Sequence, residues 1–449
     1  MNAPKTCGEE GVAPVPIVQG ETNPGGDRQT VASNFSWMLL GNVVTAASNW
    51  LTIAVIARLT TPDLVGEYAY ALALGQPLVM LSQLNLRSLQ ATDATAQNPF
   101  HDYFTLRLAC SVICLVVLGS LCLVLRPAGH TGAVILIMGA SMCFDSISDV
   151  IYGLLQQQER MKVIGVSLAL KGSTSLLGLG GALFMTRDLV WGAVASATAS
   201  AVVLLAYDLR NVGARQSADG TSSSGLLVLL TGDRLAPLWQ LVKSAAPMGL
   251  VMMLCSLTVS TPRLAVGKFL GTYELGIFAA MMSIIGVGRI VMNALGQAAT
   301  PRMARHIADG DVRKFHSVFR ALFLAGTFLS IAAPVAAYLI GEQVIVLIYG
   351  PAYRGVRNIL TWCMFAGAIS YLASFVGYAI TAARIFMAQL HLLIAVCVVG
   401  VAASWFLVPV AGLTGAAWSF ALAMAVQAIG SWALLRAKLR EMSPSLQSV

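Results

Sequence analysis

Long apolar segments separated by short polar loops dominate the pattern along this chain. Residues 43–57 and 108–125 carry no charge, and residues 323–340 and 387–435 are similarly apolar, the last being long enough to need a turn. A helix needs about 20 apolar residues to cross the hydrocarbon of a bilayer. Open sheets leave backbone groups unpaired in lipid, and the alternation typical of a membrane barrel is absent. The pattern therefore predicts an all-α polytopic membrane protein.

Twelve spans fit the pattern, six on each side of the longest polar interruption at residues 208–240. The expected spans are 33–57, 68–87, 105–125, 132–156, 163–185, 189–207, 243–267, 274–298, 317–340, 358–380, 386–409 and 412–435. The chain then divides into a disordered cytoplasmic tail, a first lobe of six helices, a cytoplasmic linker, a second lobe of six helices and a second cytoplasmic tail, at 1–30, 31–207, 208–240, 241–437 and 438–449.

Composition and charge agree with a membrane protein. Hydrophobic residues make up 57% of the chain and charged residues 11%, against roughly 25% charged in a typical soluble domain. Most of the 28 lysines and arginines fall in loops on one side if the N-terminus is cytoplasmic. We therefore expect both termini in the cytoplasm, and the net charge of +8 needs no nucleic-acid partner to explain it.

The cysteines and the polar loops carry no cofactor motif. Most of the eight cysteines lie in apolar spans, so we expect core residues and neither disulfides nor a metal site. No glycine-lysine phosphate loop occurs in a polar segment. Transport energy is then expected from an H⁺ or Na⁺ gradient or from substrate flux.

The two halves of the chain repeat each other. Residues 58–68 align with residues 268–278 at a constant offset of 210, which places Gly66 on Gly276 and Tyr68 on Phe278. Six spans separate the two segments, so both begin on the same side of the membrane. The repeat is therefore parallel, about an axis along the membrane normal, as in some transporters.

Four segments resemble the polysaccharide repeat-unit flippases of the multidrug/oligosaccharidyl-lipid/polysaccharide exporter superfamily, namely residues 57–68, 246–247, 261–271 and 297–302. The resemblance implies two six-helix lobes, V-shaped around a central cavity. It implies that undecaprenyl-diphosphate-linked oligosaccharide is flipped by alternating access across the bacterial inner membrane for exopolysaccharide or O-antigen synthesis. Its implied partners are this lipid-linked oligosaccharide, membrane lipids, a polysaccharide polymerase and export machinery.

Polar side chains recur every three or four residues on several spans, which places them on one face of each helix. A flippase must hold a diphosphate and sugars away from hydrocarbon, so it needs a wet cavity with cations, amides and hydroxyls. The alternative for each stripe is close packing between membrane helices. The substrate-binding candidates are Arg289, Arg263, Asn293, Asn42, Asn49, Gln83 and Arg87.

Ionisable residues deep in a membrane span are functional candidates by default. Arg289 lies near the middle of its expected span, which makes it the first choice for a phosphate contact, with a structural ion pair as the alternative. Asp145, Asp149 and Lys171 lie at similar depth on neighbouring spans. They form either a structural carboxylate–ammonium pair or a site for proton or sodium coupling.

Two other functions compete with a flippase. A multidrug or cation exporter of the same fold should carry acids in its cavity, whereas the spans hold three cations against Asp145 and Asp149. A membrane-embedded glycan enzyme needs a catalytic loop with acids or histidine, and the outer loop at 341–357 holds Glu342 and no histidine. The balance of charge favours an anionic substrate over a cation, and the composition of the loops favours a transporter over an enzyme.

Overall fold

The regular structure is helical throughout the part of the chain that the computed structural model describes, residues 24–92, 99–127, 129–216, 235–309, 311–383 and 386–442. This confirms the predicted all-α class. The helices are α1 (Pro24–Leu59), α2 (Pro62–Gln83), α3 (Leu86–Thr92), α4 (Phe100–Leu125), α5 (Thr131–Gln157), α6 (Met161–Thr186), α7 (Leu189–Val203), the π-helix η1 (Leu204–Asp208), α8 (Leu209–Gln216), α10 (Leu235–Phe269), α11 (Thr272–Ala308), α12 (Val312–Tyr349), the 3-10 helix η2 (Pro351–Tyr353), α13 (Arg357–Ala382) and α14 (Phe386–Met442).

Eleven helices in the described ranges are long and apolar enough to cross a membrane, and the last of them covers two spans. This segment is 53 residues long and is broken at Gly412, whose φ of 60° and ψ of −136° are not helical. Its two halves fold back on each other, since the hydroxyls of Ser404 and Ser419 lie 3.0 Å apart. The described ranges therefore contain twelve spans, as the sequence predicts.

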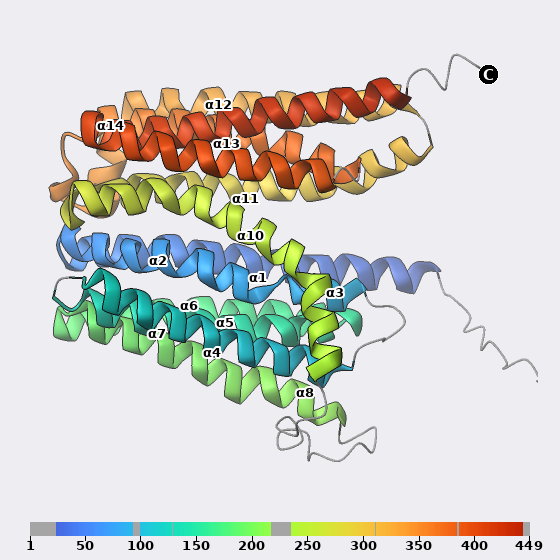
Figure 1. Cartoon of the computed structure of the whole chain (residues 1–449), viewed down its shortest axis with the longest axis horizontal. Coiled ribbons are helices and arrows are strands. Elements are labelled where there is room, and N and C mark those ends of the chain that lie inside the picture. Colours follow the sequence, from blue (N-terminus) through green and yellow to red (C-terminus); the bar gives the residue numbers. More distant parts are fainter. Residues whose placement is uncertain are drawn as a thin grey trace, which may run out of the picture.

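The helices form two lobes, α1–α8 and α10–α14 (Figure 1). The start of α1 and the end of α14 lie at the same end of the bundle (Figure 1). Large apolar side chains are exposed on outer helices, among them Val116 (62%) on α4 and Phe328 (75%) on α12. Lipid solvates such surfaces, so the chain is a multi-pass membrane protein of two six-span lobes.

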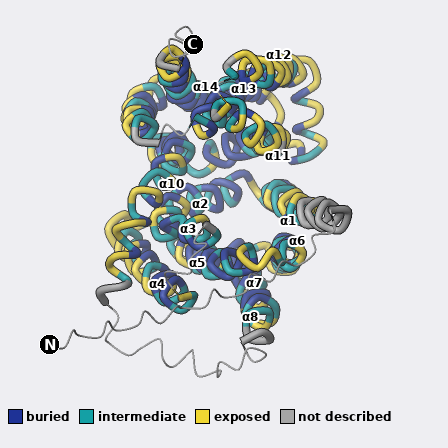
Figure 2. The backbone as a smooth tube through the Cα atoms, turned by 90° about the vertical axis from the view of Figure 1, so that its right-hand side faces the viewer, coloured by how far each residue is buried: buried dark blue, intermediate teal, exposed yellow. Residues whose placement is uncertain are grey.

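Contacts at opposite ends of the bundle join the two lobes. At the end where α1 meets α2, Arg58 donates to the carbonyls of Ile348 and Leu347 on α12, and the Trp50 indole donates to the Tyr349 hydroxyl at 3.0 Å. At the other end, an apolar cluster joins α10 to the first lobe through Leu84, Leu86, Tyr103, Leu106, Val150, Leu241 and Ala245. Viewed end-on, α2 and α10 lie side by side where the lobes meet (Figure 2).

Several helices extend beyond the predicted spans. Helix α11 continues to Ala308 and α12 begins at Val312, so much of the expected loop at 299–316 is helical. Arginine, alanine and methionine favour helix, and hydropathy marks only the part of a helix that lies in lipid. Residues 1–23 of the predicted tail, 217–234 of the linker and 443–449 of the C-terminal tail lie outside the described residues.

Candidate functional site

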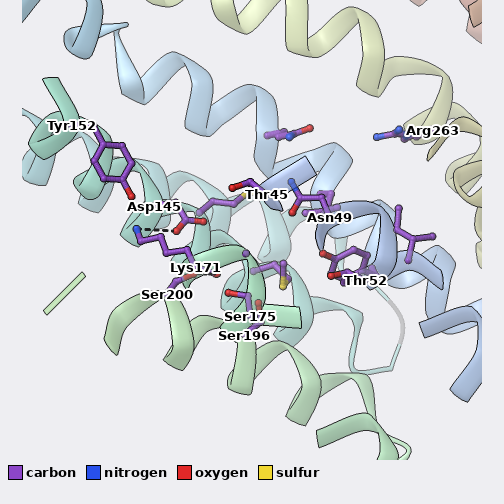
Figure 3. A pocket seen from close by; sticks show the side chains of 18 residues that line it. Thr45, Asn49, Thr52, Asp145, Tyr152, Lys171, Ser175, Ser196, Ser200 and Arg263 are labelled. Atoms are coloured by element: carbon purple, nitrogen blue, oxygen red, sulfur yellow. Dashed lines mark hydrogen bonds and ion pairs between the residues drawn. The ribbon is translucent and has the colours of Figure 1, made fainter. Parts of the chain in front are cut away.

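A cavity of about 390 Å³ lies against the first lobe, and every lining residue except Arg263 comes from α1, α2, α5, α6 or α7 (Figure 3). Its polar lining residues are Thr45, Asn49, Thr52, Gln76, Ser141, Asp145, Tyr152, Lys171, Ser175, Ser196, Ser200 and Arg263. Hydroxyls and amides at this density keep water and sugar hydroxyls hydrogen-bonded inside a membrane protein.

Helical spacing brings the polar groups of α5 and α6 into one cluster. Ser141, Asp145 and Tyr152 follow one face of α5, and Lys171 and Ser175 follow one face of α6. The Lys171 ammonium points at the Asp145 carboxylate across the gap between the two helices (Figure 3). The cavity therefore has a charged group at the depth of the helix midpoints.

Lys171 is the centre of this charged group. Its Nζ lies 3.2 Å from Asp145 Oδ1 and 3.6 Å from Asp208 Oδ2, and it donates to the Ser148 hydroxyl. The Asp208 side chain is fully buried, whereas 52% of the Asp145 side chain is exposed. One carboxylate thus holds the lysine from inside the lobe, and the other holds it at the wall of the cavity.

Asp208 has a hydrogen-bond donor on each carboxylate oxygen, which offsets the cost of burying it. It accepts hydrogen bonds from the Ser148 hydroxyl at 2.6 Å and from the Ser167 hydroxyl at 2.5 Å. The Tyr152 hydroxyl joins the network 2.7 Å from Ser167. Of the two carboxylates that hold Lys171, only Asp145 lines the cavity.

Asp208 is not among the residues predicted from the sequence, because it is the first residue of the predicted polar linker at 208–240. In the structure Asp208 ends the π-helix η1, which continues α7 without a break and turns the carboxylate into the lobe. Such π-turns inside helices are frequent at functional sites. One feature of the sequence could have indicated that Asp208 is buried: it lies between the apolar residues 204–206 and Leu209.

Asp149 belongs to a second charged group. Among the described residues, no ion pair joins it to Lys171. Arg87 Nη1 lies 3.2 Å from Asp149 Oδ1, and Arg107 Nη2 lies 3.7 Å from Asp149 Oδ2. Arg107 has no exposed surface and donates to the Ser146 hydroxyl at 3.1 Å. The structure therefore divides the expected Asp145, Asp149 and Lys171 cluster between two sites.

Arg87 and Arg107 both contact Asp149. Arg87, a candidate for substrate binding in the sequence, also donates to the Gln156 side chain at 3.3 Å. Arg107 lies two turns inside α4, which begins at Phe100. Together with Asp149 they link α3 and α4 to α5.

Two arginines of the second lobe form no ion pair with any described residue. Arg263 of α10 reaches the cavity wall, and its Nε is buried without a hydrogen-bond partner (Figure 3). Arg289 lies near the middle of α11 and is not among the residues that line the cavity. Guanidinium groups inside a membrane span without a carboxylate partner among the described residues are candidates for contact with an anion.

The remaining predicted residues are dispersed. Asn49 lines the cavity. Asn293 is exposed on α11 and accepts a hydrogen bond from the Tyr378 hydroxyl at 3.0 Å. Asn42 is exposed on α1, and Gln83 is half-buried at the last position of α2; neither lines the cavity.

No group of three metal-ligating side chains occurs among the described residues. The seven cysteines that the structure describes are free thiols, and Cys7 lies outside the described residues. The ionic chemistry of the described site therefore comes from lysine, arginine and aspartate.

The twelve spans, the two lobes and the cavity define a transporter fold. The structure is similar to the inward-facing conformation of a multidrug resistance transporter of the MATE family and MOP superfamily, with a TM-score of 0.65 and 14% identity over 91% of this chain and 96% of that one. It is also similar to a MOP superfamily transporter from Pyrococcus furiosus whose binding pocket is described as having reverse polarity, with a TM-score of 0.62 and 14% identity over 92% and 96%.

Sequence comparison then places the chain within this class. The model of the family described as "Polysaccharide biosynthesis protein" matches residues 31–307, and the chain belongs to this family. The capsular polysaccharide biosynthesis protein CapF of Staphylococcus aureus is 25% identical over 412 residues, which covers 89% of this chain and 98% of that protein. These matches confirm the resemblance identified from the sequence motifs.

Proposed function

We propose that this protein flips undecaprenyl-diphosphate-linked oligosaccharide repeat units across the bacterial inner membrane, from the cytoplasmic to the periplasmic leaflet. The product serves exopolysaccharide or O-antigen synthesis. In this proposal both termini are cytoplasmic, as the distribution of lysine and arginine favours. A polysaccharide polymerase and export machinery act after the flipped lipid is released.

The observation that carries the proposal is the setting of Arg263. Its buried Nε has no hydrogen-bond partner among the described residues, and Arg263 is the second-lobe residue that lines a cavity otherwise lined by hydroxyls, amides and other side chains of the first lobe. A guanidinium binds phosphate oxygens in a fixed fork geometry, while hydroxyls and amides bind sugars. We assign the diphosphate to the side of Arg263 and Arg289, and the sugars to the first lobe.

The size of the cavity bears on the mechanism. A volume of about 390 Å³ is at the lower end of what a drug-sized ligand occupies. A diphosphate with several sugars is larger, so the lobes must separate further to admit it. Alternating access meets this need, because the lobes can part at one end of the bundle while they stay in contact at the other.

A cation exporter of the same fold is the second candidate, since several similar solved structures are multidrug transporters. The charges at the cavity favour an anion. Asp145 is paired with Lys171, whereas Arg263 has no carboxylate partner in the described part of the chain. Family and fold also point to a membrane transporter rather than to a glycan enzyme.

Reconstitution into liposomes tests the proposal. The substrate is a fluorescent polyprenyl-diphosphate oligosaccharide, and transfer to the outer leaflet is read by an impermeant quencher. We expect protein-dependent transfer that stops when Arg263 is replaced by Gln. Transfer of a cationic dye without transfer of the diphosphate lipid would show that the exporter alternative is correct.

A further inference from the structure

We propose that the second lobe carries a binding site for an acidic membrane phospholipid, between the first turns of α12 and the last turns of α14. The site is a groove of about 410 Å³ lined by Phe315, His316, Phe319, Trp432, Leu435, Arg436, Leu439 and Arg440. This α12–α14 groove shares no residue with the transport cavity. It lies at the edge of the second lobe farthest from the first lobe (Figure 1).

Aromatic and aliphatic side chains make the floor of the groove. The rings of Phe315 and Phe319 stack with centroids 6.2 Å apart, and the ring of Trp432 lies 5.9 Å from that of Phe319 across the two helices. Phe315 and Leu435 are buried, and Trp432 remains 45% exposed. The floor is therefore fixed by packing between the helices, while one indole stays open to an incoming molecule.

Cations make the rim. Arg436 and Arg440 are one turn apart on α14, and His316 adjoins a second hollow of about 430 Å³ that Arg313 and Arg320 also line. All four arginines are exposed, and none forms an ion pair with a described residue. Asp311, at the cap of α12, pairs instead with Lys314 at 2.9 Å.

An anion bound between these arginines would reduce the repulsion among their positive charges. Like charges one turn apart on a helix repel each other and destabilise it. The backbone N–H of Lys314 and its side chain both donate to Asp311 and lower the pKa of that carboxyl, which keeps it charged and engaged away from the groove. A phosphate between the arginines would relieve the repulsion and form charge-assisted hydrogen bonds.

The surface beside the groove identifies the anion as a lipid. Moving along α12 from the rim toward the middle of the span, Leu324 is 57% exposed and Phe328 is 75% exposed, and on α14 Ile429 is 70% exposed. Acyl chains can therefore follow the helices directly from a headgroup held by the arginines. A free phosphate ion would use the cations and leave this apolar strip uncovered.

Position in the bundle agrees with a headgroup site. The groove lies at the end of the bundle that carries the start of α1 and the end of α14 (Figure 1). Basic grooves between helices at the membrane surface bind acidic headgroups, with a gain of about fivefold in affinity per cation. A lipid held there anchors that end of the second lobe to its leaflet.

Native mass spectrometry of the purified full chain, titrated with phosphatidylglycerol, tests the site. The groove variant is Arg436→Gln with Arg440→Gln, the two arginines that line the groove. The matched control is Arg302→Gln with Arg305→Gln, which removes two exposed cations from α11 near the same end of the bundle. We expect the groove variant to bind on the order of tenfold more weakly, and the control to bind like the unmodified protein. Equal losses in the two variants would overturn the proposal.

The choice of probe separates the sources of phosphate. Phosphatidylcholine should not occupy the site, and inorganic phosphate should not displace phosphatidylglycerol from it. Displacement by phosphate alone at millimolar concentration would make this an ion site and overturn the lipid assignment. Preferential retention of polyprenyl phosphate over phosphatidylglycerol would make it a substrate site and overturn the proposed occupant.

A second measurement avoids dependence on the arginine variants. Phosphatidylglycerol with brominated acyl chains should quench the fluorescence of Trp432, seen as the difference between the unmodified protein and a Trp432→Phe variant. Brominated phosphatidylcholine should quench this component far less. Equal quenching by the two lipids would show general lipid contact and no acidic site.

Discussion

Gly66 on α2 and Gly276 on α11 pack against each other across the boundary between the lobes. A Cβ added to Gly66 would lie 1.9 Å from the carbonyl oxygen of Thr272, and one added to Gly276 would lie 1.8 Å from that of Pro62. The contact is reciprocal, because Pro62 and Thr272 are themselves equivalent in the repeat. The repeated segments thus meet at the axis that relates the two lobes, and the Thr272 hydroxyl donates to Asp63 there at 3.0 Å.

Replacing Gly276 by Ala should force α2 and α11 apart. Backbone atoms cannot give way as a flexible side chain can, so we expect a lower melting temperature and weaker transport. Gly286→Ala on the same helix is the matched control, since a Cβ there meets nothing within 4 Å. Thermal unfolding in detergent and the liposome assay measure both effects. Normal behaviour of the Gly276 variant would mean that the lobes do not stay this close.

Replacing Lys171 by Met should leave Asp208 buried without its cation. Removing one partner of a buried ion pair costs about 3–5 kcal/mol, so we expect a marked loss of thermal stability. A second substitution, Asp208→Asn, should restore most of it, because the amide is neutral. A double variant no more stable than the Lys171 variant would show that Asp208 does not depend on this charge.

Replacing Asp145 by Asn tests whether the exposed end of the network couples transport to an ion. Asp145 lines the cavity and has 52% of its side chain exposed, so it is the acid of this group that a proton or sodium ion can reach. We expect the pH or sodium dependence of flipping to flatten in this variant. An unchanged profile with less protein in the membrane would assign Asp145 a structural role.

Replacing Arg289 by Ala should abolish surface polysaccharide at a normal level of membrane protein. The reason is that an anion in the membrane would lose one of two cations that no described carboxylate neutralises. Immunoblotting gives the protein level, and polysaccharide staining gives the product. Arg354→Ala, which removes an exposed arginine between η2 and α13, is the control and should change neither. Normal polysaccharide in the Arg289 variant would remove it from the phosphate site.

Hydropathy predicted the spans well, because the thickness of the hydrocarbon layer alone sets how long each apolar segment must be. It failed at Ala308 and Val312, where helices continue past the membrane and no longer need apolar residues. It also failed at Asp208, where a charged residue marks the apparent end of a span but a π-turn keeps it inside the lobe.

The sequence likewise predicted some features of the candidate site and missed others. Similar depth on neighbouring spans grouped Asp145 with Lys171 in the sequence, and the two side chains form an ion pair in the structure. Spacing could not assign Asp149, which lies one turn beyond Asp145 and pairs with Arg87 and Arg107. Depth in the membrane is readable from the sequence, but the rotation of one helix against its neighbour is not.

By itself, the sequence determined that this chain crosses a membrane twelve times in two repeated halves, since length, apolarity and the repeat are properties of single segments. Only the tertiary structure decided which charges are neutralised. Ion pairing depends on distances of a few ångströms between different helices, and those distances follow from packing, as between Lys171 and Asp208 at 3.6 Å. The same packing left the Nε of Arg263, at the wall of the cavity, without a hydrogen-bond partner in the described part of the chain.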